Sequence, residues 1–258
     1  MRVWLIALHS TVFAAFHVLP SSALSSTTRL PIGQIKSLDR SKLDKKQDAL
    51  FYDAPKLVTH TDDAFIESLK DVYRDFLPDN GATILDICSS HLSHLPSDRT
   101  FGRVDVHGMN LQELQRNPAR EATNGQAFVR DLNENPSFVG LVDQDGQYDA
   151  VLCCVGVQYL QNPEAVFAEV GRILKQDIGV VIVSFTNRFF YEKALQGWIN
   201  RGMKERAQLV KDYLRAAGGF EDIQVIGDGM SIWKQLGSLG GLSGDPFVAV
   251  VARRNGEP

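Results

Sequence analysis

The apolar positions of residues 62–77 recur at the spacing of an amphipathic helix. The buried face that this spacing predicts consists of Phe65, Leu69, Val72, Tyr73 and Phe76. Asp62 or Thr61 can cap the first turn, because a side-chain oxygen there accepts from free backbone N–H groups. Pro78 follows the end of the pattern, at a place where a proline cannot continue the helix.

Short apolar runs follow, and further helical patterns separate most of them. The runs have the composition of buried parallel strands, and we expect strands at residues 82–87, 103–109, 127–129, 148–155, 178–185, 223–226 and 247–252. Helices are expected at residues 111–116, 190–200 and 204–217. Another helix follows Asn162 and Pro163, which supply a cap and a proline at the first helical position. Its predicted buried face comprises Val166, Phe167, Val170, Ile173 and Leu174.

This order of elements predicts the fold class. Strands that alternate with helices form a parallel sheet with helices on both faces. Only the glycine-rich stretch 237–244 separates the last two strands, so we expect these two strands to be antiparallel. The sequence therefore predicts an α/β fold for residues 47–258, with a doubly wound, mostly parallel seven-stranded sheet.

The first 46 residues have the composition of a targeting leader. Residues 1–23 combine a positive start, an apolar stretch and small residues before a cleavage site, which is the layout of a signal peptide. The stretch is too short and too interrupted for a good membrane span, although a retained anchor is the alternative. Residues 24–46 are rich in Ser, Thr, Lys and Arg, as in transit peptides.

A signal peptide followed by a transit-like stretch resembles the bipartite leaders of algae with secondary plastids. The resemblance implies import into a plastid. Leu24 stands where such leaders usually have an aromatic residue, so the secretory pathway or the cell exterior is the alternative.

Charge narrows the range of partners. The chain carries a net charge of −4, and most of the leader's charged residues are basic, so residues 47–258 are the more acidic part. An acidic body excludes a broad nucleic-acid-binding face, which needs clustered Lys and Arg. The three cysteines show neither zinc-site nor CxxC spacing, and Cys153 and Cys154 are expected to be small buried residues on opposite faces of a strand.

Polar side chains follow each of the first five predicted strands. They are Asp86 with residues 88–94, then Asn110, Asp131, the pair Gln158 and Tyr159, and residues 186–188. In open α/β sheets, ligands bind outside the carboxyl ends of the strands, where strand order reverses. The sequence therefore predicts one ligand site at this edge of the sheet.

Five short motifs resemble those of class I S-adenosylmethionine-dependent methyltransferases, and they run in the family's order. They are Ile84-Leu85-Asp86-Ile87, Gly108-Met109-Asn110, Val129-Arg130-Asp131-Leu132, Tyr148-Asp149-Ala150-Val151 and Arg172-Ile173-Leu174-Lys175. The resemblance implies a Rossmann-like methyltransferase fold and S-adenosylmethionine as cofactor. It places Asn110 where the family has an acid that binds both ribose hydroxyls, and Asp131 where an acid faces the adenine amine.

A narrower resemblance joins the chain to the methyltransferase type 11-like group of plants, algae and bacteria. It rests on Phe51-Tyr52-x-x-Pro55-x-x-Val58-x-His60, Leu85-Asp86-Ile87-Cys88-Ser89-Ser90, Ser93-His94-Leu95-Pro96, Gly108-Met109-Asn110 and Ser184-Phe185-x-Asn187-Arg188. This group implies a cofactor and a fold but no particular substrate.

The resemblance yields a set of candidate site residues. The cofactor-binding candidates are Asp86, Cys88, Ser89, Ser90, Met109, Asn110, Asp131 and Leu132. The candidates for substrate handling are His91, Tyr159 and Arg188. No carboxylate or cysteine spacing beside the histidines supports a metal site.

Each substrate-handling candidate has a structural alternative. His91 is either a base for a substrate hydroxyl or a partner of the backbone. Tyr159 either lines the substrate pocket or packs, and Arg188 either binds an anionic group or pairs with an acid of the chain.

The cofactor loop departs from the family pattern. Cys88, Ser90 and Leu92 stand where glycines normally let the cofactor approach the backbone. We expect methyl transfer from S-adenosylmethionine to a small-molecule acceptor, without a stable membrane anchor; a catalytically silent binding or regulatory module is the alternative. A nicotinamide-dependent oxidoreductase is disfavoured, because it needs GxGxxG after the first strand.

Overall fold

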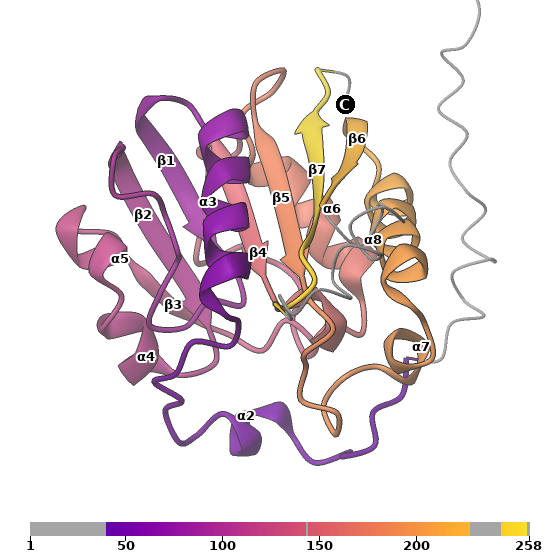
Figure 1. The fold of residues 1–258 in the computed structure, drawn as a ribbon. Coiled ribbons are helices and arrows are strands. Elements are labelled where there is room, and N and C mark those ends of the chain that lie inside the picture. Colours follow the sequence, from indigo (N-terminus) through magenta and orange to yellow (C-terminus); the bar gives the residue numbers. More distant parts are fainter. Residues whose placement is uncertain (1–39, 143, 228–243, 257–258) are drawn as a thin grey trace, which may run out of the picture.

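The computed structural model describes residues 40–142, 144–227 and 244–256. Within these ranges seven strands form one sheet in the order β3-β2-β1-β4-β5-β7-β6 (Figure 1). The strands are β1 (Asn80–Asp86), β2 (Thr100–Gly108), β3 (Ala127–Val129), β4 (Ala150–Cys154), β5 (Val180–Phe185), β6 (Phe220–Ile226) and β7 (Val248–Arg254). The expected leader, as far as residue 39, lies outside the described residues, as does most of the glycine-rich stretch 237–244.

The pairing of the strands confirms the predicted fold. β1 to β5 pair in parallel, whereas β7 runs antiparallel to both β5 and β6. The parallel strands in Figure 1 therefore point downward and place their carboxyl ends at the lower edge of the sheet. Strand order reverses between β1 and β4, which is the predicted position for a ligand site.

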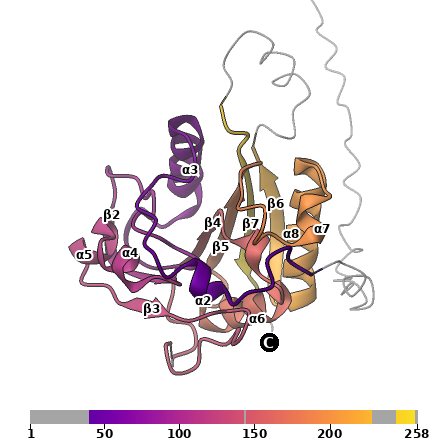
Figure 2. The same ribbon diagram turned by 90° about the horizontal axis from the view of Figure 1, so that it is seen from below.

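Helices cover the two faces of the sheet. They are α2 (Asp48–Phe51), α3 (Asp63–Phe76), α4 (Leu111–Gln115), α5 (Pro118–Ala122), the 3₁₀ turn η1 (Val157–Tyr159), α6 (Pro163–Ile173), α7 (Gln196–Ile199) and α8 (Met203–Ala217). α3 and α8 lie on opposite sides of the sheet (Figure 2). Alternate residues of each central strand face the two helical layers, so Cys153 lies in the cluster with α6 and α8 and Cys154 against the other, as predicted.

The predicted helix at residues 190–200 is mostly wrong. Only its last third is helical, as α7, and the preceding residues form turns. Their backbone groups bond to other segments instead: the Phe190 N–H donates to the Tyr159 hydroxyl, and the Leu195 N–H donates to the Gln158 carbonyl. Hydrogen bonds to distant segments thus take the place of the i→i−4 bonds of a helix. Such tertiary contacts commonly override the local helix propensity of a segment.

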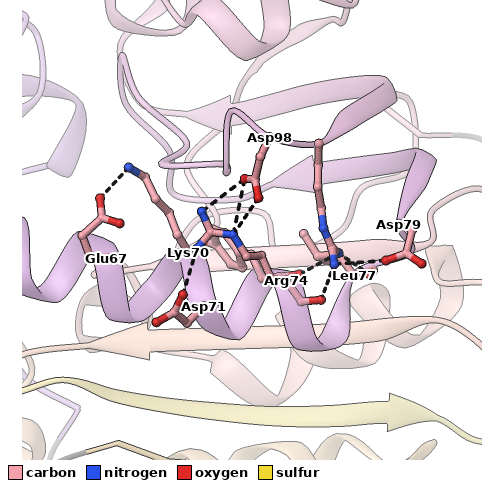
Figure 3. A network of polar contacts seen from close by, with 9 residues as sticks. Glu67, Lys70, Asp71, Arg74, Leu77, Asp79 and Asp98 are labelled. Atoms are coloured by element: carbon pink, nitrogen blue, oxygen red, sulfur yellow. Dashed lines mark hydrogen bonds and ion pairs between the residues drawn. The ribbon is translucent and has the colours of Figure 1, made fainter.

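The connection from β1 to β2 contains no helix, although a parallel pair usually needs one to cross over. A turn-rich loop at residues 87–99 makes this connection and is fastened to the end of α3 (Figure 3). The Arg99 guanidinium donates to the Leu77 and Arg74 carbonyls at 2.9 and 2.6 Å and pairs with Asp79. Arg74 in turn pairs with Asp98 at 3.1 Å.

Residues 40–46 pack against the body, so the boundary expected at residue 47 lies too late. Arg40 pairs with Glu164 of α6, and the Lys46 carbonyl accepts from the buried Lys193 ammonium at 2.9 Å. Lys42 forms an isolated β-bridge with Leu195. Basic residues that resembled transit-peptide composition serve here as ion-pair and hydrogen-bond partners.

The helices that the structure describes include none that is both long enough and apolar enough to cross a membrane.

Candidate cofactor and acceptor site

A cavity of about 260 Å³ lies at the carboxyl ends of the parallel strands. Every predicted cofactor-binding residue lines it, together with Tyr159 and Arg188, whereas His91 does not. Residues 40–60, which we call the strap, run beneath the strand ends through α2, as Figures 1 and 2 show. The strap supplies further lining residues, which are Asp48, Tyr52, Lys56 and His60, followed by Thr61.

Asp48 holds the strap over the cavity. Its carboxylate pairs with Lys42 at 2.5 Å and Lys193 at 3.2 Å, and it accepts from the Asn133 amide at 3.0 Å. Lys42 and Lys193 are both buried, so removing the shared carboxylate would leave two ammonium groups poorly compensated. The strap is therefore joined both to the segment after β5 and to the loop after β3.

Three non-glycine residues of the cavity wall adopt left-handed backbone conformations. They are Cys88, His94 and Val155, with φ of 54°, 53° and 51°. The conformation is least expected for the β-branched Val155, whose N–H donates to the Ser184 carbonyl at 2.8 Å. Such residues typically cost about 1–3 kcal/mol each and gather at functional sites. Their position supports this cavity as the site.

Asp86 ends β1 and is buried below the cavity. The Ser89 hydroxyl donates to its carboxylate at 2.6 Å, and Ser93 provides a second hydroxyl contact. Burial raises the pKa of Asp86 to about 7, and the two hydroxyls act against this rise. Asp86 can therefore change its charge near neutral pH, in the position that the resemblance gives to a cofactor-binding acid.

Asn110 lines the cavity, but its amide is used within the protein. Its side-chain oxygen caps α4 by accepting from the Gln112 and Glu113 N–H groups at 3.0 and 3.2 Å. Its nitrogen donates to the Tyr52 and Asp53 carbonyls at 2.9 and 2.8 Å. The expected role in holding ribose is therefore at odds with this geometry, because both amide groups already fasten the strap to α4.

Glu113 is a cavity-lining carboxylate that the sequence analysis did not single out. One carboxylate oxygen accepts from the Lys56 N–H at 2.6 Å and the other from the Ser90 hydroxyl at 2.6 Å. Its only sequence signal was its position three residues after Asn110, where a glutamate usually completes a helix cap. The structure uses it to bind the strap and the loop after β1.

The wall after β3 has the groups expected for an adenine ring. Asp131 accepts from the Asn133 N–H at 2.8 Å through one carboxylate oxygen, which leaves its other oxygen available for an amine. Met109 and the buried Leu132 add apolar surface to the same cavity. Gly108 is required here, because a Cβ at this position would lie 2.5 Å from the Ser89 carbonyl oxygen.

His107 supports the loop after β1 from below. Its ring contacts the Cys88 N–H at 3.4 Å on one side and the Arg130 carbonyl at 3.0 Å on the other. Burial lowers the pKa of His107 to about 4, so the imidazole is neutral near pH 7. A neutral ring can accept from Cys88 through one nitrogen while donating to Arg130 through the other.

His91 is the predicted substrate-handling residue that the structure moves away from the cavity. Its ring contacts the Ser90 hydroxyl at 3.2 Å, so its partner is a side chain and not the backbone group that the structural alternative expected. Two other histidines, His60 and His94, line the cavity instead. Burial lowers the pKa of both, to about 4 for His94, so both are neutral near pH 7.

Tyr159 and Arg188 line the cavity while also serving structural roles. The Tyr159 hydroxyl accepts from the Phe190 N–H at 2.9 Å, and the two rings stack with centroids 6.1 Å apart. Arg188 pairs with Asp245 at 2.6 Å, as its structural alternative predicted. Each residue therefore combines a place in the cavity wall with a contact inside the protein.

The sheet order and the position of the cavity define a Rossmann-like nucleotide-binding fold of the methyltransferase type. Residues 85–183 match a family described as a methyltransferase domain. This match runs from the end of β1 into β5 and agrees with the methyltransferase resemblance of the motifs.

The chain is similar to solved structures of methyltransferases, of which the first described here has a TM-score above 0.5. A chain from the complex of the Haloferax volcanii Trm112 methyltransferase activator with its candidate methyltransferase is 15% identical, with 76% of this chain and 92% of that chain covered and a TM-score of 0.52. An S-adenosylmethionine-dependent methyltransferase from Mesorhizobium loti is 16% identical, with 71% and 96% covered and a TM-score of 0.47. A Haemonchus contortus phosphoethanolamine N-methyltransferase bound to S-adenosylhomocysteine is 14% identical, with 73% and 52% covered and a TM-score of 0.48. No curated protein sequence matches the chain.

Proposed function

We propose that this protein transfers the methyl group of S-adenosylmethionine to a small-molecule acceptor bound in the cavity beneath the strap. The observation that carries the proposal is the convergence of groups from the ends of β1, β2, β3, β4 and β5 on this one cavity. Methyl transfer from a sulfonium depends mainly on holding two reactants in line, so a shaped cavity can supply much of the rate.

The residues present fit S-adenosylmethionine at the adenine end of the cavity. Asp131 has one carboxylate oxygen available for the adenine amine, and Met109 and Leu132 can contact the ring faces. The fit differs from the family pattern at the ribose, because Asn110 is engaged with α4 and the strap. When bound, the cofactor supplies an electrophilic methyl group; the residues named here bind and orient it.

The volume of the cavity adds a requirement. Small-molecule sites usually measure about 300–1,000 Å³, whereas this cavity measures about 260 Å³. The cavity is therefore too small for a nucleoside cofactor together with an acceptor. We propose that the strap moves outward when the two ligands bind.

Thermal unfolding with S-adenosylhomocysteine, the demethylated product, tests the proposal. At about 100 times the dissociation constant, linkage adds about 2.7 kcal/mol of stability. For a domain of this size the melting temperature should rise by roughly 5–10 °C. Asp131→Asn should weaken binding at least about tenfold, because an amide N–H would face the adenine amine in place of an acceptor.

Asp145→Asn is the matched control for that variant. Asp145 is an exposed surface residue paired with Arg172, so its amide should leave the ligand affinity unchanged. If neither S-adenosylmethionine nor S-adenosylhomocysteine shifts the melting temperature at millimolar concentration, the silent binding module becomes the better account. The helix-free connection after β1 and its serine-rich loop are the observations that would favour that alternative.

We also propose that the leader directs the protein to a plastid. The support is the layout of residues 1–46 in the sequence. A fluorescent protein fused after residue 46 should accumulate in plastids of an alga with secondary plastids, and accumulation in the medium would contradict the proposal.

A further inference from the structure

Three polar side chains of the cavity wall have free hydrogen-bonding groups. Thr61 is 4% exposed, and its hydroxyl has no hydrogen-bond partner among the described residues. The imidazoles of His60 and His94 likewise form no hydrogen bond within those residues. A buried polar group without a partner is unfavourable, and it usually indicates a missing water or ligand.

These groups lie toward the opposite end of the cavity from the adenine wall. Thr61 precedes Asp62, which bonds reciprocally to the backbone and side chain of Asp245; Asp245 pairs with Arg188, directly beyond the end of β5. Asp131 follows β3, at the other edge of the parallel strands. Four strand spacings separate β3 from β5, or about 19 Å at the usual spacing of about 4.8 Å. Thr61 and its neighbour His60, whose ring contacts Phe190, are therefore placed for the acceptor, and His94 lies close enough to His60 to act on it electrostatically.

Aromatic rings form the wall beside these groups. The Phe190 ring lies edge-on to His60, with centroids 5.7 Å apart, and edge-on to Phe51 at 5.2 Å. The Tyr159 ring stacks on the Phe190 ring, and both residues line the cavity. Aromatic walls favour a planar apolar ligand, since ring pairs gain from edge-to-face and offset-stacked contacts.

The formal charges at this end are balanced among the described residues. The Lys56 ammonium lies 4.3 Å from the Phe51 ring centroid and donates to the Phe51 carbonyl at 2.7 Å. The Glu113 carboxylate accepts from the backbone N–H of Lys56, not from its ammonium. Arg188 pairs with Asp245. The charges of these four side chains sum to zero, so this end has no net charge that would favour a charged acceptor.

We infer that His60, Thr61 and His94 form the acceptor subsite, and that this subsite binds an uncharged phenol through its hydroxyl group. The inference rests on the proposed function, because it names the acceptor class for that same methyl transfer. Neutral imidazoles and a threonine hydroxyl can each both donate and accept, so together they match a phenolic hydroxyl, which also does both.

His60 is the group that receives the proton. As the phenolic oxygen bonds to the methyl carbon, the carbon–sulfur bond breaks with its electron pair left on sulfur, and the hydroxyl proton passes to an imidazole nitrogen. The Glu113 carboxylate favours a proton on His60, whereas the Lys70 ammonium disfavours one on His94. His94 therefore serves as a hydrogen-bonding partner.

Calorimetric titration of the full chain, saturated with S-adenosylhomocysteine, tests the subsite with catechol as the probe. Catechol should bind at least tenfold more tightly than 1,2-dimethoxybenzene, which lacks the hydroxyls, and than benzoate or benzylammonium, which carry charges. Thr61→Val should weaken catechol binding about fivefold to tenfold through loss of one hydrogen bond. His60→Phe keeps a ring in place but should abolish the appearance of the monomethyl ether with S-adenosylmethionine.

Matched controls isolate the effect. Thr59→Val makes the same change at an exposed position two residues away, and His91→Phe changes the histidine outside the cavity; both should bind catechol as the parent does. Each variant is first checked for unchanged affinity for S-adenosylhomocysteine, which reports on folding and on the cofactor end. Tighter binding of benzoate or benzylammonium than of catechol would overturn the inference, as would equal binding of catechol and its dimethyl ether.

The same titrations separate this inference from the proposed function. If the protein binds S-adenosylhomocysteine but does not bind catechol, the phenol subsite would be overturned and methyl transfer left in place. If the protein binds catechol but binds neither S-adenosylmethionine nor S-adenosylhomocysteine, the subsite would be supported and methyl transfer contradicted.

Discussion

The two ends of the cavity differ in how their polar groups are satisfied. At the cofactor end, Asp86 and Asn110 are both bonded to the protein's own hydroxyl and backbone groups. At the acceptor end, the hydroxyl of Thr61 and the ring nitrogens of His60 have no such partners among the described residues. The first end is thus organised before any ligand arrives, whereas the second has hydrogen-bonding groups that only a ligand or water can use.

This difference teaches where substitutions should act on stability and where on binding. A bonded polar group contributes to folding, and its loss leaves its former partners unsatisfied. An unpartnered group contributes nothing of this kind to the free protein, so its loss should appear only when a ligand binds. The following predictions test this division from the largest expected effect to the smallest.

Asn110→Leu should cause the largest loss of stability. The substitution removes the cap of α4 and leaves the Tyr52 and Asp53 carbonyls without their donor. A lost cap costs about 1 kcal/mol, and an unsatisfied carbonyl costs about 1–3 kcal/mol at the half-buried Tyr52 and about 1 kcal/mol at the exposed Asp53, so we expect a loss of about 3–5 kcal/mol. Urea unfolding followed by circular dichroism measures it. Asn135→Leu, at an exposed turn, is the control and should cost less than about 1 kcal/mol.

Asn110→Asp sharpens this prediction. The carboxylate keeps the cap of α4 but turns an acceptor toward the two strap carbonyls, which already are acceptors. We expect a loss of about 2–3 kcal/mol, together with weaker protection of the strap from proteases. Tighter cofactor binding with unchanged stability would restore the ribose role that the resemblance gave to Asn110.

Removal of residues 40–46 should also destabilise the protein. A chain that begins at Gln47 loses the Arg40–Glu164 pair, and the buried Lys193 loses both Asp44 and the Lys46 carbonyl. Poorly compensated buried charge makes the expected loss about 2–4 kcal/mol relative to a chain that begins at Arg40. Equal melting temperatures of the two chains would show that these residues contribute only local contacts, as the leader boundary at residue 47 implied.

Asp86→Asn should change how stability depends on pH. Because the pKa of Asp86 rises from 3.8 to about 7 on folding, the folded state binds more protons between these values, and stability falls as pH rises through that window. The amide does not titrate, so the variant should be more stable than the parent at pH 8, by about 1–3 kcal/mol. The difference should shrink below pH 6 and vanish near pH 4, as unfolding at a series of pH values would show.

The histidines act in the opposite direction in the same experiment. The pKa values of His94 and His107 fall from 6.5 to about 4 on folding, so both add stability as pH rises through this window. Asp86 partly masks their effect in the parent. The variant should therefore show the steeper rise in stability between pH 4 and pH 6.5, and a parallel course of parent and variant would contradict the raised pKa of Asp86.

The sequence predicted the sheet, and its candidate cofactor-binding residues line one cavity, for a physical reason. Buried strands such as residues 148–155 require uninterrupted apolar runs, and the polar residues directly after them must meet at one edge of a parallel sheet. Hence Asp86 and Asp131 were found from order alone. Periodicity also located α3 and α8 within about one residue of their observed ends.

The remaining site residues depend on long-range contacts that no local pattern encodes. The strap is polar and mostly irregular, so nothing local showed that Lys42 and Lys193 would meet at Asp48. Asn110 was predicted to contact the cofactor because it is polar and follows a strand. Its side chain instead bonds to two N–H groups of α4 and to the carbonyls of Tyr52 and Asp53, which lie more than 50 residues earlier in the chain. His91 and His94 lie in one loop, and only the backbone turn between them decides which one reaches the cavity.

Thr61→Val should have the smallest effect on the free protein, and it tests the comparison most directly. Threonine and valine have nearly the same shape, so packing is preserved, and the change replaces a buried hydroxyl that has no partner among the described residues with a methyl group. At the bonded end such a change would leave another group unsatisfied; here it leaves none, so we expect a change within about 0.5 kcal/mol, or a slight gain in stability. Thermal unfolding in the absence of ligand measures this change.

A loss above about 1.5 kcal/mol would mean that the Thr61 hydroxyl already has a partner in the free protein. The acceptor end would then be as fully bonded as the cofactor end, and the proposed division between folding groups and ligand groups would fail.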